Sequence, residues 1–471
     1  MKSNRTILLT LLFLSLLLIS NGYARAAIRF PAVITDHMVL QQNTEVVLWG
    51  WADPGERITV QSTWQPVTNY SATVAADGTW RLKMSTPSAG GPYELIFQSS
   101  SDRKTIKDVL IGEVWICSGQ SNMEMPLKGF TSQPVEGSNE IIAQSSNPQL
   151  RLFTVKRNTS SMPLLDCEGS WVLSTPQEAA FFSAVAYMYG SYLQKVLQVP
   201  VGLIHSSWGG TPAEAWTDRE TLESSFKEIP IRILEKSIHR SPAVLFNAMI
   251  HPIIPYTMRG VIWYQGEGNR MAPEQYRSLF PAMITNWRQR WGIGDFPFYF
   301  VQIAPYKYDD KKNSAELREA QLLTMLHTPH TGMAVTMDVG EVESIHPKNK
   351  ADVARRLAYW ALAKTYGMEG IECSGPIFRT MATEGNHAVL EFDFASNGLS
   401  SFGKPLDGFT IAGSDRKFYS AVAVIKGKNL IVSSDSVSQP VAVRYAWSNY
   451  AEGHLFNTAG LPASSFRTDN W

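Results

Sequence analysis

The chain has 471 residues, 44% of which are hydrophobic, and its 42 Lys and Arg residues balance its 42 Asp and Glu residues. At roughly 100–200 residues per domain, this length predicts two or three domains with a full-sized apolar core. The net charge of zero argues against a general nucleic-acid binder, which normally carries an excess of Lys and Arg.

The first 26 residues have the pattern of a targeting signal. Lys2 and Arg5 precede a run of Leu, Ile and Phe over 7–19, which is shorter than the roughly 20 residues that a membrane-spanning helix needs. The A-x-A cleavage pattern follows at 24–26. The sequence predicts a signal peptide over 1–26 and a mature protein that is secreted or periplasmic, with no membrane association.

The segment over 27–108 carries the two-residue alternation that is typical of β-strands. Its runs EVVLWGWA and RITVQSTW are rich in β-branched and aromatic residues, and DPGE and ADGTW supply turn residues between strands. This part of the chain is predicted to form an antiparallel β-sandwich.

Short apolar runs alternate with helical patterns over 109–370. VLIGEVWICSG, VPVGLIHSS and FPFYFVQIA indicate buried strands, and YRSLFPAMITNWRQRW indicates an amphipathic helix. Alternating strands and helices imply a parallel sheet, which binds its ligand at the carboxyl ends of its strands. The β pattern returns over 371–471, which is predicted to be a C-terminal β-rich module.

Polar residues gather at the ends of three predicted strands, as GQSNM over 119–123, WGGT over 208–211 and WYQGEGN over 263–269. A serine at a strand-to-helix turn can present its hydroxyl, and its own N–H can face a developing oxyanion. Taken alone, Ser121 is more simply explained as a helix N-cap.

The second and third of these segments offer hydrogen-bond donors. Gly209 and Gly210 let the backbone come close to a ligand, although a tight turn is the commoner reason for paired glycines. Gln265 or Asn269 could donate an amide N–H to an oxyanion, and Glu267 could fix a neighbour by hydrogen bonding.

A serine hydroxyl needs a base to become a nucleophile. Of the nine histidines, His346 has three carboxylates upstream within one loop, on Asp338, Glu341 and Glu343. A carboxylate on the far ring nitrogen holds the imidazole in the required tautomer and stabilises the imidazolium. His346 is therefore the preferred base, and His205 is the fallback.

No pattern predicts a metal ion or an organic cofactor. His327 and His330 form an H-x-x-H pair, but no carboxylate or cysteine completes a set of ligands. Cys117 lies on an apolar strand and is expected to be a small buried residue. An odd number of cysteines leaves at least one free, and a Cys167–Cys373 disulfide is one possible pairing.

GQSNM, SSWGGT, WYQGEGN and DVG…IHPKNK occur in this order, and together they resemble the sialate O-acetylesterase-like branch of the SGNH (GDSL-like) serine hydrolases. The start with DHMVLQQ and the end with VRYAWSNY and LFNTAGLPASSFRTD are also similar to that family. The resemblance implies an α/β fold, with an SGNH-type parallel-sheet catalytic domain over 109–370 flanked by N-terminal (27–108) and C-terminal (371–471) β modules.

The resemblance also implies a serine esterase that removes O-acetyl groups from sugars through an acetyl-serine intermediate, without a cofactor. Ser121 matches the nucleophile and His346 the base. The matching oxyanion donors are the N–H of Ser121, one of the two glycine N–H groups at 209–210, and a side-chain amide, for which Gln265 is favoured over Asn269.

The third member of the triad is the open point. Many SGNH enzymes carry Asp three residues before the histidine, and here that position is Glu343. Glu343 is the first choice for orienting His346. Asp338, Glu341 and a backbone carbonyl are the alternatives.

The resemblance implies an acetylated carbohydrate as substrate. An O-acetylated sialic acid is the first candidate, and acetylated xylan or another plant polysaccharide is the second. A sialate carboxylate would call for an arginine, and Arg259, Arg270 and Arg318 lie near the motifs. The alternative from another class is a non-catalytic carbohydrate-binding protein.

Overall fold

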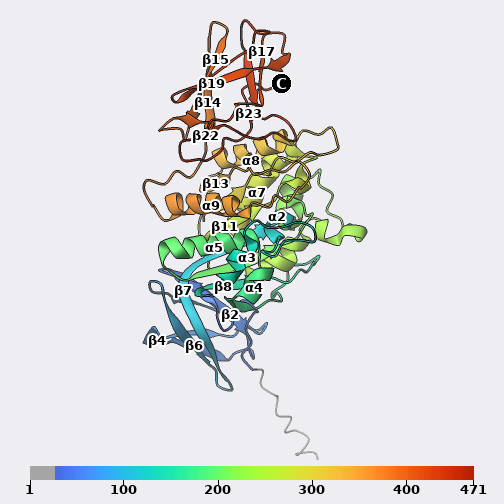
Figure 1. The fold of residues 1–471 in the computed structure, drawn as a ribbon. Helices are drawn as coiled ribbons and strands as arrows, with labels where there is room; N and C mark the ends of the chain where they lie inside the picture. The colour runs from blue at the N-terminus through green and yellow to red at the C-terminus, as the bar shows by residue number, and fades with distance from the viewer. Residues whose placement is uncertain (1–26) are drawn as a thin grey trace, which may run out of the picture.

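The computed structural model describes residues 27–471, so the predicted signal peptide lies outside the described residues. Figure 1 shows three tiers along the molecule: β-strands at one end, a mixed layer of strands and helices in the middle, and a second set of β-strands that contains the C-terminus. Within 27–471, none of the helices has the length and the hydropathy needed to cross a bilayer.

The first tier covers the part of the chain whose alternation predicted β structure, and its strands pair antiparallel except β1, which pairs parallel with β7 (Arg103–Gly119). β2 pairs with β5, and β3 pairs with both β4 and β6. Aromatic side chains such as Trp80 and Phe97 are buried between the strands. The bounds are β1 (Val39–Gln41), β2 (Glu45–Trp51), β3 (Arg57–Ser62), β4 (Gln65–Thr73), β5 (Thr79–Ser85) and β6 (Gly90–Gln98).

One long strand, β7 (Arg103–Gly119), belongs to both the first and the second tier. Its first half pairs antiparallel with β6, and its second half pairs parallel with β10 and β11. Asp108 interrupts it with a φ of 53°, and its carboxylate binds Arg151 at 2.6 Å. The domain boundary predicted at 108/109 therefore falls at a kink inside a strand, where the chain bends from one sheet into the next.

The central sheet runs in the order β13-β12-β11-β7-β10-β8-β9. All of its pairs are parallel except β8 with β9, so the predicted parallel sheet is present. The bounds are β8 (Asn147–Thr154), β9 (Trp171–Ser174), β10 (Val201–Ser207), β11 (Gly260–Tyr264), β12 (Phe298–Val301) and β13 (Thr331–Ala334).

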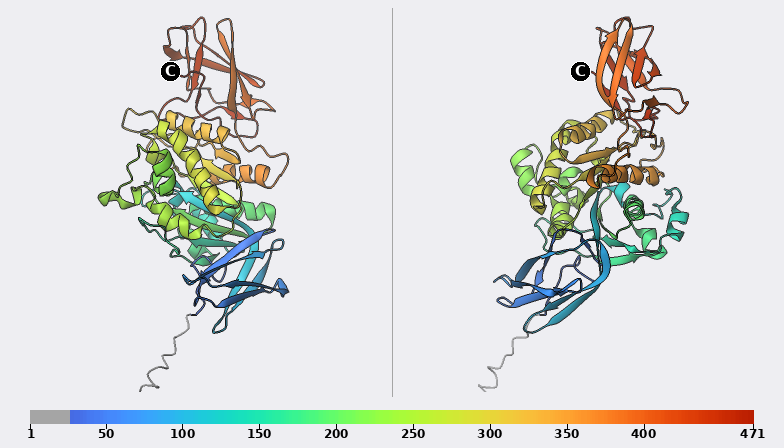
Figure 2. Two further views of the ribbon diagram at one scale, coloured as in Figure 1. Left: turned by 180° about the vertical axis from the view of Figure 1, so that it is seen from behind. Right: turned by 90° about the vertical axis from the view of Figure 1, so that its left-hand side faces the viewer.

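Helices cover both faces of this sheet (Figure 2). The side chains of β11 show the two layers, since Trp263 packs with α7 while Ile262 and Tyr264 pack with α5 and α9. This alternation follows from the two-residue period of a strand. The helices are α2 (Ser121–Glu124), α3 (Ser138–Ala143), α4 (Pro176–Phe181), α5 (Ala184–Leu197), α6 (Arg219–Ser225), α7 (Pro273–Trp291), α8 (Ala315–His327) and α9 (Lys350–Trp360), with short 3₁₀ or π segments η1 (Ala213–Trp216), η2 (Glu235–Arg240), η3 (Phe246–Ile250), η4 (His251–Ile253), η5 (Glu267–Asn269) and η6 (Ala361–Thr365).

The third tier consists of short antiparallel strands in two four-stranded sheets, β14-β15-β20-β19 and β18-β17-β21-β23, and one two-stranded sheet, β16-β22. The bounds are β14 (Ile377–Glu384), β15 (His387–Asp393), β16 (Leu399–Ser400), β17 (Phe409–Ala412), β18 (Phe418–Ser420), β19 (Val422–Lys426), β20 (Asn429–Ser433), β21 (Ala442–Tyr445), β22 (Phe456–Asn457) and β23 (Phe466–Arg467).

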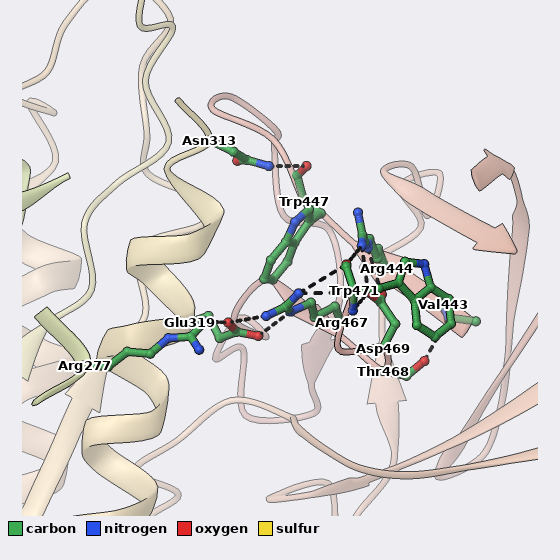
Figure 3. Close-up of polar contacts among 10 residues, drawn as sticks. All are labelled: Arg277, Asn313, Glu319, Val443, Arg444, Trp447, Arg467, Thr468, Asp469 and Trp471. Atoms are coloured by element: carbon green, nitrogen blue, oxygen red, sulfur yellow. Dashed lines mark hydrogen bonds and ion pairs between the residues drawn. The ribbon is translucent and has the colours of Figure 1, made fainter. Parts of the chain in front are cut away.

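Arginines connect the third tier to α7 and α8. Glu319 of α8 accepts from Arg467 of β23 at 2.7 and 3.0 Å, and it also pairs with Arg277 of α7, as Figure 3 shows. The guanidinium of Arg467 lies 5.2 Å from the ring centroid of Trp447. The backbone carbonyl of Trp447 in turn accepts from Asn313 at 3.2 Å.

Arg318, the neighbour of Glu319, is fully buried at the same interface. Its guanidinium donates to Ser465 Oγ at 3.0 Å and to the backbone carbonyls of Ala446, at 3.2 Å, and Ser448. A buried guanidinium is stable only when acceptors surround it. The third tier supplies three of those acceptors, so its position is tied to the central sheet.

The cysteines form no disulfide. Cys117, Cys167 and Cys373 are all free thiols, so the considered Cys167–Cys373 pairing is not formed. Cys117 is completely buried on β7, as its apolar surroundings predicted.

Replacing Arg318 with Ala should destabilise the protein strongly, because it leaves buried carbonyl and hydroxyl acceptors without a donor. We expect a loss of about 3 kcal/mol in the free energy of unfolding. Arg379→Ala is a matched control, since Arg379 forms an exposed ion pair with Glu391 and should cost less than about 1 kcal/mol. Denaturant unfolding of both variants tests the interface, and equal losses would contradict it.

Candidate active site

The ends of three adjacent strands bring the three polar segments together. Gly119, the last residue of β7, pairs with Ser207 at the end of β10 and with Tyr264 at the end of β11. The chain crosses from one side of β7 to the other between β10 and β11, which makes this edge the topological switch point where open α/β sheets bind ligands.

Gly119 lets the turn that leads to Ser121 form. Its φ is 140°, and a Cβ atom there would lie 2.2 Å from the carbonyl oxygen of Tyr264. Only glycine fits so close to the neighbouring strand. The next residue, Gln120, ties the turn to the WYQGEGN segment, because its Oε1 accepts from Gly268 N at 3.1 Å.

Ser121 begins the short helix α2, and its hydroxyl lies 2.8 Å from His346 Nε2. His346 comes from the loop after β13, the edge strand, and this loop reaches back past β12 and β11 to the centre of the sheet. Both side chains are half-buried. The structure therefore brings the predicted nucleophile and base, which are 225 residues apart, into hydrogen-bond contact.

The other ring nitrogen of His346 contacts an amide and not a carboxylate. Nδ1 lies 2.6 Å from Oε1 of Gln133, and the ring of Phe130 packs edge-on at 5.6 Å. Two reciprocal backbone hydrogen bonds of 3.0 Å between Phe130 and Gln133 close a tight turn that fixes both side chains. Gln133 thus holds the position expected for the third member of a triad.

This contact corrects the prediction for Glu343. The Glu343 side chain is exposed, and within residues 27–471 it forms no hydrogen bond or ion pair with His346. Asp338 is bound to Arg356 at 2.6 and 2.7 Å, and Glu341 accepts from the backbone N–H of Lys348 at 2.9 Å. Asp338 and Glu341 therefore bind other partners, and Glu343 points to solvent.

Burial lowers the pKa of His346 to about 4, and the positive charge of Lys350 lowers it further in the same direction. The amide of Gln133 carries no charge that could stabilise an imidazolium. The ring is thus held neutral, with Nε2 free to accept the hydroxyl proton of Ser121 once Nδ1–H donates to Gln133.

The glycine turn after β10 lies against Ser121. A Cβ atom on Gly209 would lie 3.2 Å from Cβ of Ser121, so glycine permits the close approach. The N–H of Gly209 donates to Oε2 of Glu124, the last residue of α2, at 2.6 Å. Among the described residues, no acceptor is found for the N–H of Gly210, which has a φ of 72°.

Gln265 and Asn269 do not face Ser121, in contrast to their predicted role as oxyanion donors. Gln265 is fully buried, and its Nε2 donates to Asn269 Oδ1 at 2.7 Å and to the Thr211 carbonyl at 3.3 Å. Asn269 donates to Glu214 Oε2 at 2.8 Å and accepts from the N–H of Ala213. These two amides therefore support the WGGT turn and the residues after it through hydrogen bonds to Thr211 and Ala213.

The arginine at this edge is Arg157, which lies outside the sequence motifs. It forms an ion pair with Glu124 and lies 5.6 Å from the ring centroid of Trp208. Trp208 also stacks on His239 at 5.0 Å. The result is an aromatic and basic surface next to the glycine turn.

The three arginines named from the sequence are engaged elsewhere. Arg259 binds Glu113 at 2.7 and 3.0 Å, Arg270 pairs with Asp310, and Arg318 is buried at the interface with the third tier.

The fallback base His205 is buried and bonded to Ser207 Oγ at 2.5 Å. Burial lowers the pKa of His205 to about 4. No group of three or more His, Cys, Asp or Glu residues within 27–471 has the geometry to hold a metal ion.

This arrangement can transfer an acyl group. A serine hydroxyl bonded to a neutral imidazole can lose its proton as it attacks a carbonyl carbon. Backbone N–H groups at the start of α2 and in the glycine turn lie close to Ser121, and such groups can donate to an oxyanion.

A family model described as a carbohydrate esterase, sialic acid-specific acetylesterase, matches residues 111–362. The sialate O-acetylesterase of Mus musculus is 31% identical over 93% of this chain and 94% of its own length, and that of Homo sapiens is 30% identical over 97% and 95%. The crystal structure of a carbohydrate acetylesterase from Xanthomonas citri covers 94% of this chain and 100% of its own, with 38% identity and a TM-score of 0.87.

Replacing Gln133 with Glu should raise the pKa of His346 from about 4 by roughly 1–2 units, because an adjacent carboxylate stabilises the imidazolium. An NMR titration of the His346 ring measures the shift. Glu343→Gln is the control, since its exposed side chain should leave the pKa unchanged. A shift in the control but not in Gln133→Glu would reverse the assignment.

Proposed function

The chain belongs to the sialic acid-specific acetylesterase family of carbohydrate esterases, and from this premise we propose that it removes O-acetyl groups from sugars through a covalent acetyl-serine on Ser121. Membership makes the protein an esterase, so the alternative of a non-catalytic carbohydrate-binding protein falls away. The observation that carries the proposed mechanism is the 2.8 Å contact between Ser121 Oγ and His346 Nε2.

In the first half of the reaction, Ser121 Oγ attacks the carbonyl carbon of the acetyl group while His346 Nε2 takes its proton. Gln133 keeps the proton of the neutral ring on Nδ1, so that Nε2 is the basic nitrogen. The tetrahedral intermediate then collapses, and His346 returns the proton to the departing sugar oxygen. The sugar hydroxyl leaves, and the acetyl group stays on Ser121.

The oxyanion of the tetrahedral intermediate is assigned to backbone donors. The N–H of Ser121 lies in the first turn of α2, where N–H groups have no acceptor within the helix. The glycine turn approaches Ser121 from the other side, and Gly210 is its uncommitted donor because the N–H of Gly209 is paired with Glu124.

In the second half, His346 Nε2 takes a proton from water, and the hydroxide oxygen attacks the acetyl-serine carbonyl. Collapse of the second tetrahedral intermediate releases acetate and returns the proton from His346 to Ser121 Oγ. His346 must be neutral at the start of both halves. Because its pKa is lowered to about 4, the enzyme should keep its activity into mildly acidic solution.

An O-acetylated sialic acid is the proposed substrate, which is supported by the names of the relatives. Arg157 is the cation next to the glycine turn that could meet a sialate carboxylate, since its side chain stays exposed although it pairs with Glu124. The second candidate is acetylated xylan or another plant polysaccharide. It is favoured by the engagement of Arg259, Arg270 and Arg318 with protein partners, which leaves them unable to bind a sialate.

The finer architecture is part of the same proposal. We assign the SGNH-type catalytic domain to 109–370, with β modules over 27–108 and 371–471. The signal pattern over 1–26 supports secretion or a periplasmic location. The three aligned strand ends support the SGNH assignment, since they carry the nucleophile turn and the glycine turn on neighbouring strands.

Ser121→Ala should lower the rate of aryl acetate hydrolysis by roughly 10⁴-fold or more, as loss of the nucleophile does in serine hydrolases. Ser224→Ala, on the exposed face of α6, is the control and should keep the wild-type rate. Wild-type turnover by Ser121→Ala would rule out the proposed mechanism.

Acetate release from O-acetylated sialic acid should be faster than release from acetylated xylan at equal acetyl concentration. Arg157→Ala should raise KM for the sialate, because the carboxylate loses a charged partner, and leave KM for an uncharged aryl acetate unchanged. Faster release from xylan would support the second candidate. If the enzyme releases acetate from neither glycan, both candidate substrates are excluded.

A further inference from the structure

The motif IHPKNK contains a residue that the proposed chemistry does not use, Lys350. Its side chain is completely buried at the first position of α9, and its Nζ donates to Asn122 Oδ1 at 2.5 Å. The ammonium also lies 5.6 Å from the ring centroid of Tyr264. Burial and the positive end of the helix dipole both disfavour a cation at this place. The presence of a lysine at this position is therefore not explained by the stability of the fold.

Asn122, the residue after Ser121, connects Lys350 to the rest of the site. Its Nδ2 donates to Glu267 Oε1 at 2.9 Å and to the backbone carbonyl of Ile345 at 3.1 Å. Ile345 directly precedes His346. One buried amide thus joins the serine turn, the WYQGEGN segment and the histidine loop.

Burial and the charge of Lys350 both act on the pKa of His346. Burial lowers the pKa of Lys350 to about 7, while Glu267 and Glu341 act in the opposite direction. Burial also raises the pKa of Glu267, against its hydrogen bond from Asn122 and the charge of Lys350. Below pH 7 the ammonium is charged and disfavours a second positive charge on His346, whose pKa it lowers.

We propose that Lys350, Asn122 and Glu267 form a buried bridge that positions Ser121 against His346 and brings the ammonium of Lys350 to the histidine loop. All three are positioning residues, because they act through Ser121 and His346. The inference rests on the proposed serine mechanism.

The electrostatic effect of the bridge on His346 is opposite to that of a triad carboxylate. In a triad with a carboxylate, the third member both orients the histidine and stabilises its charged form. Here Gln133 orients the ring without a charge, and Lys350 makes the charged form less stable. The site is thus adapted to keep its base unprotonated at low pH.

The decisive variant is Lys350→Met, whose unbranched side chain is one atom shorter and which removes the charge and the donor. We expect kcat to fall about tenfold with little change in KM. The acid limb of kcat/KM should move to higher pH by about one unit, because the imidazolium no longer faces an ammonium. A purely structural role would not move this limb.

Lys348→Met is the matched control, since Lys348 is exposed two residues earlier on the same loop. It should leave kcat, KM and the acid limb unchanged. The proposal is overturned if the acid limb of kcat/KM in Lys350→Met stays at the wild-type pH, or if only KM changes.

Glu267 gives a second test that does not depend on the folding of Lys350→Met. Glu267→Gln retains an oxygen that can accept from Asn122, whereas Glu267→Ala removes it. We expect Glu267→Gln to keep most of kcat and Glu267→Ala to lose about tenfold. Equal rates for the two variants would contradict the bridge.

Labelling by a serine-reactive phosphonate separates this inference from the proposed mechanism. If the phosphonate labels the wild-type enzyme but the Lys350 and Glu267 variants keep wild-type kinetics, the bridge is refuted and the mechanism is not. Wild-type enzyme that turns over substrate but resists the phosphonate at Ser121 would refute the mechanism and the bridge with it.

Discussion

The close approach of three parallel strand ends at Gly119 is the constraint on which the rest of the site depends. Hydrogen bonding in the sheet aligns the ends of β7, β10 and β11, so the residues after each strand must share one edge. Gly119 touches the carbonyl of Tyr264 too closely for any side chain. The serine turn is therefore placed by the backbone before any functional side chain contributes.

The other side of the site is assembled from loops that need separate support. The histidine loop crosses two strands to reach Ser121. The third tier supports the start of this loop, because Gly453 N donates to the carbonyl of Met337 at 3.0 Å. Arg318 and Glu319 fix that tier to α8. Loop geometry far from the chemistry thus depends on an interface that the motifs do not reveal.

The sequence predicts the parallel sheet because strand periodicity is a local signal. It predicts the pairing of Ser121 with His346 through the family motifs and the nearby carboxylates, although the ring is bonded to Gln133 and not to those carboxylates. It does not predict Gln133, which lies 213 residues before His346 in a loop without a motif. The triad pattern calls for a carboxylate beside the histidine, and an amide does not fit that pattern. Glycines at 129 and 137 bracket this loop, which follows GQSNM after five residues, and they are its signal in the sequence. The prediction that Gln265 or Asn269 donates to the oxyanion was wrong, because the sequence does not show which side of a turn a buried amide faces.

Mass spectrometry of the enzyme quenched in acid during turnover tests the central claim most directly. The account predicts one acetyl group on the peptide that contains Ser121 and none on the same peptide of Ser121→Ala. Lys350→Met provides a comparison in which the acetylated form is reached more slowly. An enzyme that releases acetate at its full rate while the Ser121 peptide never carries an acetyl group would contradict the account.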